Sequence, residues 1–350
     1  MNRSLTVAST LLIIVIVTYV LVIGKTLLIP LIMAIFIWHL LNTITNSVKG
    51  LPKVGNYIPY SVAMLVAIGI VVMFGYTLFN VISSNVNDVI QASSRYQANL
   101  IKLFNSIDNK FHIKVLANLQ QFMQNISIQN ILVNIYGVFT SITGYTMIIS
   151  LYVIFLFIEQ QAFKLKLNAL FPQKNHRQLV DNIMTHIVQD TQTYVGLKSL
   201  MSLTTALSSW IIMTLVGLDF AEFWALLIFF LNFIPNIGSI IATIFPALLA
   251  LIQFETYTPF IVITSGIIIV QFIMGNIIEP RYMGNSLNLS PLVILFALSV
   301  WGALWGILGM FLSVPITVIM MIIFAHFDKT RPVAIFLSQD GNIQKSYGRR

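Results

Sequence analysis

Long apolar runs constrain the fold of this sequence more than any other feature. Hydrophobic residues make up 57% of the 350 residues and charged residues only 9%, whereas a soluble domain carries about 25% charged residues. A helix that crosses a membrane needs about 20 consecutive apolar residues. The sequence therefore predicts an all-α polytopic membrane protein with about eight apolar segments, at 11–23, 26–41, 60–82, 137–158, 194–218, 219–252, 259–278 and 290–324.

The first two runs are separated only by Gly24 and Lys25. A signal peptide is not indicated, because no small-residue cleavage site follows the first run and a second apolar run begins almost at once. We interpret the two runs as a helical hairpin that turns at Gly24 and Lys25.

Two apolar segments are too long for one crossing, and both are interrupted. Segment 219–252 is broken around Pro235 and Gly238, because proline removes a helical hydrogen bond and clashes with the preceding turn. Segment 290–324 contains several glycines and Pro315. Each segment either crosses as a kinked helix or dips in and returns as a helical hairpin, and we favour hairpins. Paired segments of this kind point to the binding site of a transporter.

Gly302, Gly306 and Gly309 lie at positions i, i+4 and i+7 of the second long segment. On one helix this spacing predicts a bare face, and small residues there let a neighbouring backbone approach closely in a membrane.

Stretch 275–291 is a polar island between two apolar runs. Glu279 and Arg281 flank Pro280 there, and a charge beside a membrane span is costly unless it faces protein or water. Two interpretations of Glu279 stay open, namely a handle for a proton or cation and a structural ion pair with Arg281. Lys198, in the segment 194–218, we interpret as an interfacial lysine.

Polar residues in the broken segments and beside the island are candidates for binding a small polar solute. We expect hydrogen bonds from the side chains of Asn232, Asn236, Gln271 and Asn276, and from backbone groups freed around Pro235 and Gly238. We also expect the two long segments to meet near the middle of the membrane.

The composition along the chain suggests five parts. They are N-terminal transmembrane helices (1–82), an extramembrane amphipathic helical segment (83–136), a transmembrane helix with a basic cytoplasmic helix (137–193), a transport core (194–325) and a cytoplasmic tail (326–350). With the N-terminus inside, 13 of the 19 Lys and Arg residues lie on the cytoplasmic side, as the positive-inside rule requires. Both termini are therefore predicted to be cytoplasmic.

Several function classes find no support in the sequence. The chain has no cysteine, and it carries no His-Glu-x-x-His, Gly-x-Ser-x-Gly or phosphate-binding loop motif. No Lys/Arg run is long enough for a nucleic-acid surface, so the net charge of +8 is attributed to topology and anionic lipid. We expect no enzyme, no cofactor, no metal site and no nucleic-acid partner.

Three long motifs occur in order, and their sequences are LNFIPNIGSIIATIFPALLAL, GNIIEPRYMGNSLNLSPLVIL and WGALWGILGMFLSVPI. Together they resemble the signature of the autoinducer-2 exporter family of bacterial membrane proteins, also called PerM-like permeases. The resemblance implies a multi-pass, homo-oligomeric transporter of the bacterial inner membrane. Members are associated with export of the quorum-sensing signal autoinducer-2, and others with sodium–proton antiport.

The family's motifs fall on particular residues of this chain. Its Pro-Asn-x-Gly turn falls on Pro235, Asn236 and Gly238, and its acidic-Pro motif on Glu279 and Pro280. Its Gly-x-x-Leu-x-Leu-x-Pro motif covers Gly284, Leu287, Leu289 and Pro291. The hypothesis is a secondary transporter that exports a small polar solute such as autoinducer-2, coupled to protons or sodium. A sodium–proton antiporter and an uncoupled channel remain the alternatives.

Overall fold

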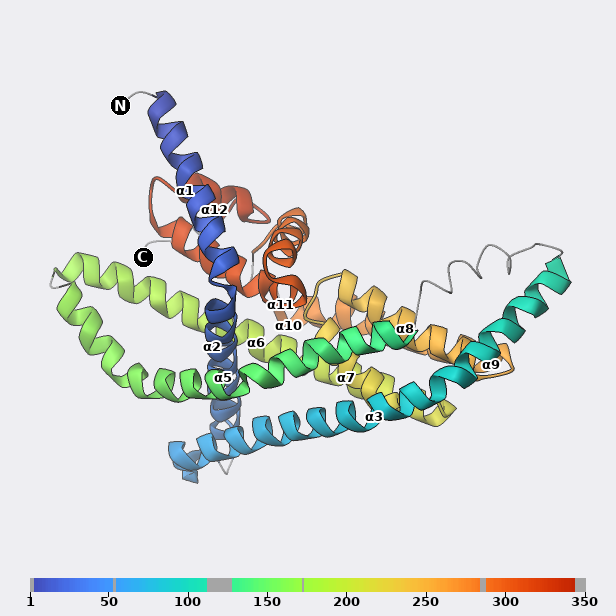
Figure 1. Cartoon of the computed structure of the whole chain (residues 1–350). Coiled ribbons are helices and arrows are strands. Elements are labelled where there is room, and N and C mark those ends of the chain that lie inside the picture. The colour runs from blue at the N-terminus through green and yellow to red at the C-terminus, as the bar shows by residue number, and fades with distance from the viewer. Residues whose placement is uncertain (1–2, 53–54, 112–127, 172, 284–287, 344–350) are drawn as a thin grey trace. The chain divides into compact units, whose positions relative to one another are not determined.

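The computed structural model describes residues 3–52, 55–111, 128–171, 173–283 and 288–343, and these are almost entirely helical (Figure 1). This confirms the all-α prediction. The helices are α1 (Arg3–Ile23), α2 (Lys25–Lys49), α3 (Tyr60–Phe111), α5 (Ile128–Leu170), α6 (Lys174–Val216), α7 (Ala221–Leu231), α8 (Ile237–Gln253), α9 (Tyr257–Phe272), α10 (Glu279–Met283), α11 (Pro291–His326) and α12 (Arg331–Leu337), with a 3-10 turn η1 (Gly55–Tyr57) and a π-helical turn η2 (Ile273–Ile278).

Within the described residues, five helical stretches are long and apolar enough to cross a membrane. They are Lys25–Lys49, Tyr60–Val81, Arg177–Val216, Tyr257–Tyr282 and Pro291–His326. Shorter apolar helices cover Leu11–Ile23, Gly144–Gln160, Ala221–Leu231 and Ile237–Gln253. The number and length of these helices fit a polytopic membrane protein.

The chain forms two compact units. Unit 1 comprises Met1–Met64, Tyr145–Gly196 and Met283–Arg350, and unit 2 comprises Leu65–Gly144 and Leu197–Tyr282. The division into five parts by composition stays a prediction.

In unit 1, helices α1 and α2 do not form the predicted hairpin. Gly24 has φ −75° and ψ 0°, its N–H donates to the Val20 carbonyl at 2.7 Å, and its own carbonyl accepts from the Leu28 N–H at 2.8 Å. The helical hydrogen bonds therefore pass through Gly24, and the chain runs on from α1 into α2 without turning back (Figure 1). The hairpin prediction was wrong because Gly24 keeps a right-handed backbone conformation.

In unit 2, the first long segment is a helical hairpin, as predicted. Helices α7 and α8 are its two arms. The Gln253 side chain accepts from the Asp219 N–H at 2.8 Å and donates to the Gly217 carbonyl at 2.9 Å. Gln253 closes α8, whereas Gly217 and Asp219 precede α7, so both ends of the segment lie together at the base of the hairpin.

The tip of this first hairpin depends on two residues of unusual backbone geometry. Asn236 has φ 60°, which only a few residue types tolerate readily. A Cβ atom added to Gly238 would lie 1.7 Å from the Leu231 carbonyl oxygen, at the end of the other arm. Glycine is therefore required where the two arms come closest.

In unit 1, the second long segment is also a hairpin, and its turn is at Gly306. Gly306 interrupts α11 with φ 65° and ψ −145°. A Cβ atom on Gly309 would lie 1.9 Å from the Trp301 carbonyl oxygen, whereas residues eight apart in a continuous helix are about 12 Å apart. The backbone thus folds back on itself within a few residues.

The three glycines of the second hairpin therefore do not form one bare helix face, as the sequence suggested. Gly306 makes the turn, and Gly302 and Gly309 lie on opposite arms, where a Cβ on Gly302 would meet the Met310 side chain at 2.8 Å. Pro246 and Pro315 lie inside helical arms and not at the breaks.

Helix α3 is a single element of 52 residues, which corresponds to a length of about 78 Å. It continues the predicted span of 60–82 without a break, so no new helix begins at residue 83. Within the predicted extramembrane segment 83–136, residues 112–127 lie outside the described part of the chain. Within unit 2 the far part of α3 binds the base of the first hairpin, where Asn99 donates to the Ile252 carbonyl at 3.0 Å.

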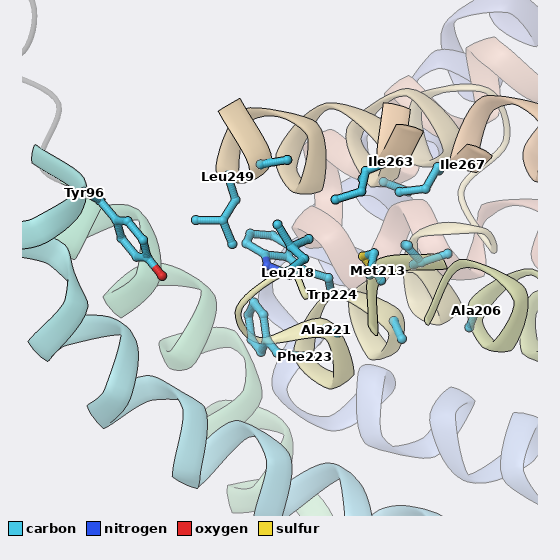
Figure 2. Close-up of a cluster of buried hydrophobic side chains, with 14 residues drawn as sticks. Tyr96, Ala206, Met213, Leu218, Ala221, Phe223, Trp224, Leu249, Ile263 and Ile267 are labelled. Atoms are coloured by element: carbon cyan, nitrogen blue, oxygen red, sulfur yellow. The ribbon is translucent and has the colours of Figure 1, made fainter. Parts of the chain in front are cut away.

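A cluster of buried apolar side chains holds the first hairpin against α6 and α9 (Figure 2). Trp224 of α7 stacks on Phe245 of α8, with the ring centroids 6.1 Å apart. A Cβ on Gly266 of α9 would lie 3.1 Å from the Ile212 side chain of α6. The absence of a side chain at Gly266 therefore lets these two membrane helices approach closely.

Candidate functional site

The candidate site in unit 2 contains a buried ion pair between helices α6 and α10. Lys198 Nζ lies 2.6 Å from Glu279 Oε1, and the two side chains are only 10% and 27% exposed. Glu279 thus pairs with Lys198, whereas Arg281 is exposed. The sequence left two interpretations of Glu279 open. The one that paired Glu279 with Arg281 was wrong, because the partner is Lys198.

Lys198 is also not the interfacial lysine expected from the sequence, because it is buried. The signal that could have identified it was its position within the apolar segment 194–218. An ionisable side chain in a membrane span is a functional candidate by default, and it needs a partner. Glu279 was not an obvious partner because it lies 81 residues away in the sequence.

A second polar contact joins α9 to the tip of the first hairpin. Gln271 Nε2 donates to Asn232 Oδ1 at 3.2 Å, and both residues are partly buried. Asn232 follows directly after α7, at the start of the turn. The structure thus brings together two of the residues predicted to bind a solute, one of them on the hairpin tip.

The π-helical turn η2 links these two contacts. The Glu279 N–H donates to the Met274 carbonyl, five residues earlier, so the turn holds one residue more than an α-helical turn. In a regular α-helix the eight residues from Gln271 to Glu279 rotate by about 800°, which leaves the side chains about 80° apart. With one residue absorbed by the turn, the rotation is about 700°, and both side chains project from nearly the same face.

The other candidate residues lie outside this cluster of polar contacts. Asn236 and Asn276 are exposed, and Pro235 is half-buried. Pro280 and Arg281 are exposed, Gly284 lies outside the described residues, and Pro291 opens α11. The functional roles of these residues stay predictions.

An ionic cluster lies at the opposite end of the first hairpin, at its base. Asp219 accepts hydrogen bonds from Tyr96 Oη at 2.8 Å and from the Arg95 guanidinium. Burial raises the pKa of Tyr96 to about 12, and the hydrogen bond to Asp219 adds to the rise. Arg95 and Tyr96, on the part of α3 beyond the predicted membrane span, therefore stay hydrogen-bonded to the hairpin base at neutral pH.

Among the described residues no group of three or more His, Asp or Glu side chains could hold a metal ion. The polar contacts of the candidate site are the Lys198–Glu279 ion pair and the hydrogen bond between the Gln271 and Asn232 amides. Such groups can bind and release a polar solute or a small cation.

Comparisons with known proteins identify the family of this chain. Residues 11–329 match the family described as AI-2E family transporter. The chain is 27% identical over 317 residues to the AI-2 transport protein TqsA of Escherichia coli (strain K12), covering 89% of each protein. It is 26% identical to the putative transport protein YhhT of the same strain over 295 residues, covering 83% of this chain and 82% of YhhT.

A putative transport protein of Borreliella burgdorferi is 36% identical over 207 residues, which are 57% of this chain and 56% of that protein. The family match extends over nearly all of the described helices, from α1 to the end of α11. The protein is thus a multi-pass membrane protein, and it belongs to the AI-2E transporter family.

Proposed function

We propose that this protein is a secondary transporter that exports a small polar solute, such as autoinducer-2, across the bacterial inner membrane, and that it works as a homo-oligomer. The observation that carries the proposal is the Lys198–Glu279 ion pair within the membrane-spanning part of unit 2. A buried charge pair is not needed to stabilise a helix bundle, since apolar residues of similar volume often stabilise it as well or better. Its presence therefore supports a functional role.

The Gln271–Asn232 contact supports a role for the hairpin tip in binding. Both side chains are amides, and each offers donors and an acceptor. A solute with hydroxyl or carbonyl groups can replace the contact between the two amides and bind both of them. Because Asn232 belongs to the hairpin and Gln271 to α9, binding would then change how tightly the tip is held against α9.

Coupling to an ion would act through Glu279. A proton on its carboxylate, or a cation beside it, weakens the attraction between Glu279 and the Lys198 ammonium. The released ammonium then becomes available to other partners. By this route, the protonation of Glu279 on α10, or a cation bound beside it, would change which groups Lys198 on α6 can contact.

The same ion pair favours sodium–proton antiport as the second candidate function. A monovalent cation can replace the ammonium of Lys198 beside the Glu279 carboxylate, and this exchange requires no organic solute. The two candidates differ in what crosses the membrane, so they can be separated by direct measurement.

The test uses purified protein in proteoliposomes. Uptake of autoinducer-2 is measured with and without an imposed pH or sodium gradient, and sodium–proton exchange is followed in parallel with a pH-sensitive dye. Saturable uptake that depends on a gradient supports the exporter, and dye signals without uptake support the antiporter. Protein carrying Glu279→Gln should lose the gradient dependence, and full gradient-dependent flux in this variant would remove Glu279 from the coupling mechanism.

A further inference from the structure

Helix α6 carries a buried polar stripe within its apolar, membrane-spanning part. Lys198, Ser202, Thr205 and Ser209 lie at positions i, i+4, i+7 and i+11, which places them on one face of the helix. All four residues are buried. This stripe, named here the α6 stripe, extends from the Lys198–Glu279 ion pair toward the centre of unit 2.

Two hydroxyls of the α6 stripe lack the hydrogen bond that neighbouring threonines of the helix make. Thr204 and Thr205 donate to the carbonyls of Leu200 and Met201, four residues earlier, at 2.9 Å. Ser202 and Ser209 are 1% and 0% exposed, yet within the described part of the chain their hydroxyls have no hydrogen-bonding partner.

A buried hydroxyl without a partner destabilises a protein, because its desolvation is not compensated. Alanine at these two positions would avoid this cost and would favour the helix. The two serines therefore reduce stability where they lie. Residues of this kind are typical of sites that bind something else.

Two contacts set the register of α6 against the antiparallel helix α9 and its extension through η2. Lys198 lies opposite Glu279, and Ile212 lies opposite Gly266. Each step forward along α6 therefore corresponds to one step back along α9. In this register Ser202 is level with Gly275 and Asn276 in the π-helical turn, and Ser209 is level with Ile268 and Ile269, one helical turn or less before Gln271.

The α6 stripe thus faces the same length of helix that carries the candidate site. Ser202 is level with the segment that runs from Gln271 to Glu279, and Ser209 is level with the residues just before Gln271. Charge is balanced, because the ion pair contributes one positive and one negative group. The remaining groups are hydroxyls and amides, which can both donate and accept.

We propose that the α6 stripe is one wall of the solute path in unit 2, and that the Ser202 and Ser209 hydroxyls bind a neutral, hydroxyl-rich solute as it passes between α6 and α9. The proposal rests on the proposed transport function, and it specifies the class of solute. A neutral solute with several hydroxyls satisfies the two serines and both amides without unbalancing the ion pair.

The first test uses the absence of cysteine from the natural sequence. Ser202→Cys and Ser209→Cys each place a single thiol on the α6 stripe, and Leu203→Cys and Leu207→Cys place one on the exposed face of the same helix. Each variant is reconstituted into proteoliposomes and treated with the water-soluble reagent 2-(trimethylammonium)ethyl methanethiosulfonate. A thiol reacts as its thiolate, which forms in water and not in lipid.

The stripe cysteines are expected to react at least about tenfold faster than the two controls, because a thiol in contact with water ionises far more readily than one in lipid. Autoinducer-2 is expected to slow their reaction. Stripe cysteines that react no faster than the controls would overturn the proposal, because the stripe would then be a dry packing surface.

The second test separates binding from packing. Ser202→Ala and Ser209→Ala should raise the KM for autoinducer-2 several-fold, while the Tm stays unchanged or rises. Thr204→Val is the matched control, because Thr204 lies outside the α6 stripe and its hydroxyl is already bonded within the helix, and the KM of this variant should not change. A lowered Tm with an unchanged KM in the serine variants would show that they only pack, and would reject the proposal.

Failure of the transport function can be told apart from failure of this inference. If wild-type protein does not move autoinducer-2, the choice of solute is wrong, and the cysteine reaction rates still decide whether the α6 stripe is a water-accessible path. If wild-type protein transports autoinducer-2 but the stripe cysteines do not react, the transport function stands and the path lies elsewhere.

Discussion

The ammonium of Lys198 lies 2.6 Å from the carboxylate of Glu279, which is 81 residues away in the sequence. Both residues belong to helical stretches that are long and apolar enough to cross a membrane. This pair connects α6 to α10 at the point where the π-helical turn ends. Glu279, the acidic residue of the polar island at 275–291, is thus paired with a side chain on another helix.

Loss of one partner should destabilise the protein more than loss of both. Lys198→Met leaves the Glu279 carboxylate partly buried without its partner, and breaking a buried pair this way costs on the order of 3–5 kcal/mol. The double variant Lys198→Met with Glu279→Gln should recover most of that loss. Thermal unfolding in detergent measures both effects.

The control for this comparison is the exposed pair between Lys166 and Glu159. Exposed ion pairs contribute at most about 1 kcal/mol, so Lys166→Met should lower the Tm little. Equal losses for Lys198→Met and Lys166→Met would mean that the Lys198–Glu279 pair behaves as an ordinary surface pair.

Gly238→Ala should disrupt the tip of the first hairpin. The new Cβ would lie 1.7 Å from the Leu231 carbonyl oxygen, so the two arms must separate, at a cost of about 2 kcal/mol or more. The expected results are a lower Tm and slower solute uptake. Gly69→Ala is the matched control, because nothing lies within 4 Å of a Cβ there. Alanine in that helix should be neutral or stabilising by up to about 1 kcal/mol.

Deletion of one residue should be tolerated in the π-helical turn but not in the regular part of α9. Deleting Ile277 converts the turn to α-helix and leaves Glu279 seven positions after Gln271, a rotation of about 700°, so both side chains still share a face. Deleting Ile268, which is similarly exposed, rotates the following residues by about 100° relative to the packed positions Ile263 and Ile267.

The measurement for the deletions is the effect of Lys198→Met in each background. In the Ile277 deletion this substitution should still destabilise the protein, which shows that the ion pair survives. In the Ile268 deletion it should have little further effect, because the pair is already lost. A pair that survives both deletions would show that the π-helical turn does not set the direction of Glu279.

Tyr96 should make stability sensitive to alkaline pH. Burial and the hydrogen bond to Asp219 raise its pKa to about 12 in the folded protein, above the value of about 10 for an unfolded chain. Its contribution is therefore fully present below about pH 10 and is lost as the pH rises through 12. Unfolding measured from pH 9 to pH 12 should show this decline, and Tyr96→Phe should make the curve shallower. An unchanged slope in Tyr96→Phe would assign the decline to other groups.

Much of the fold could be predicted from local sequence. The lengths of the apolar runs predict the membrane-spanning helices, because hydrocarbon thickness sets the number of residues needed. The excess length and the internal breakers of 219–252 and 290–324 predict two hairpins, because a 34-residue or 35-residue apolar segment must either kink or return. The polar residues Asn232, Gln271 and Glu279 were found because polar groups are rare and costly in a membrane.

The mistakes arise where a backbone angle or a distant partner decides the outcome. Gly24 and Gly306 are both glycines within apolar runs, yet Gly24 keeps φ −75° and continues the helix, whereas Gly306 adopts φ 65° and reverses the chain. Glycine allows both conformations at similar cost. Only the packing of the flanking helices selects one.

The sequence by itself determined that this protein spans a membrane and that two of its apolar segments are interrupted. Only the tertiary structure decided that Glu279 pairs with Lys198 and not with Arg281, that Gln271 contacts the hairpin tip, and that the helix face carrying Ser202 and Ser209 is buried. The physical reason is that hydropathy is a local property of the chain, whereas each of these contacts depends on how helices distant in the sequence pack together.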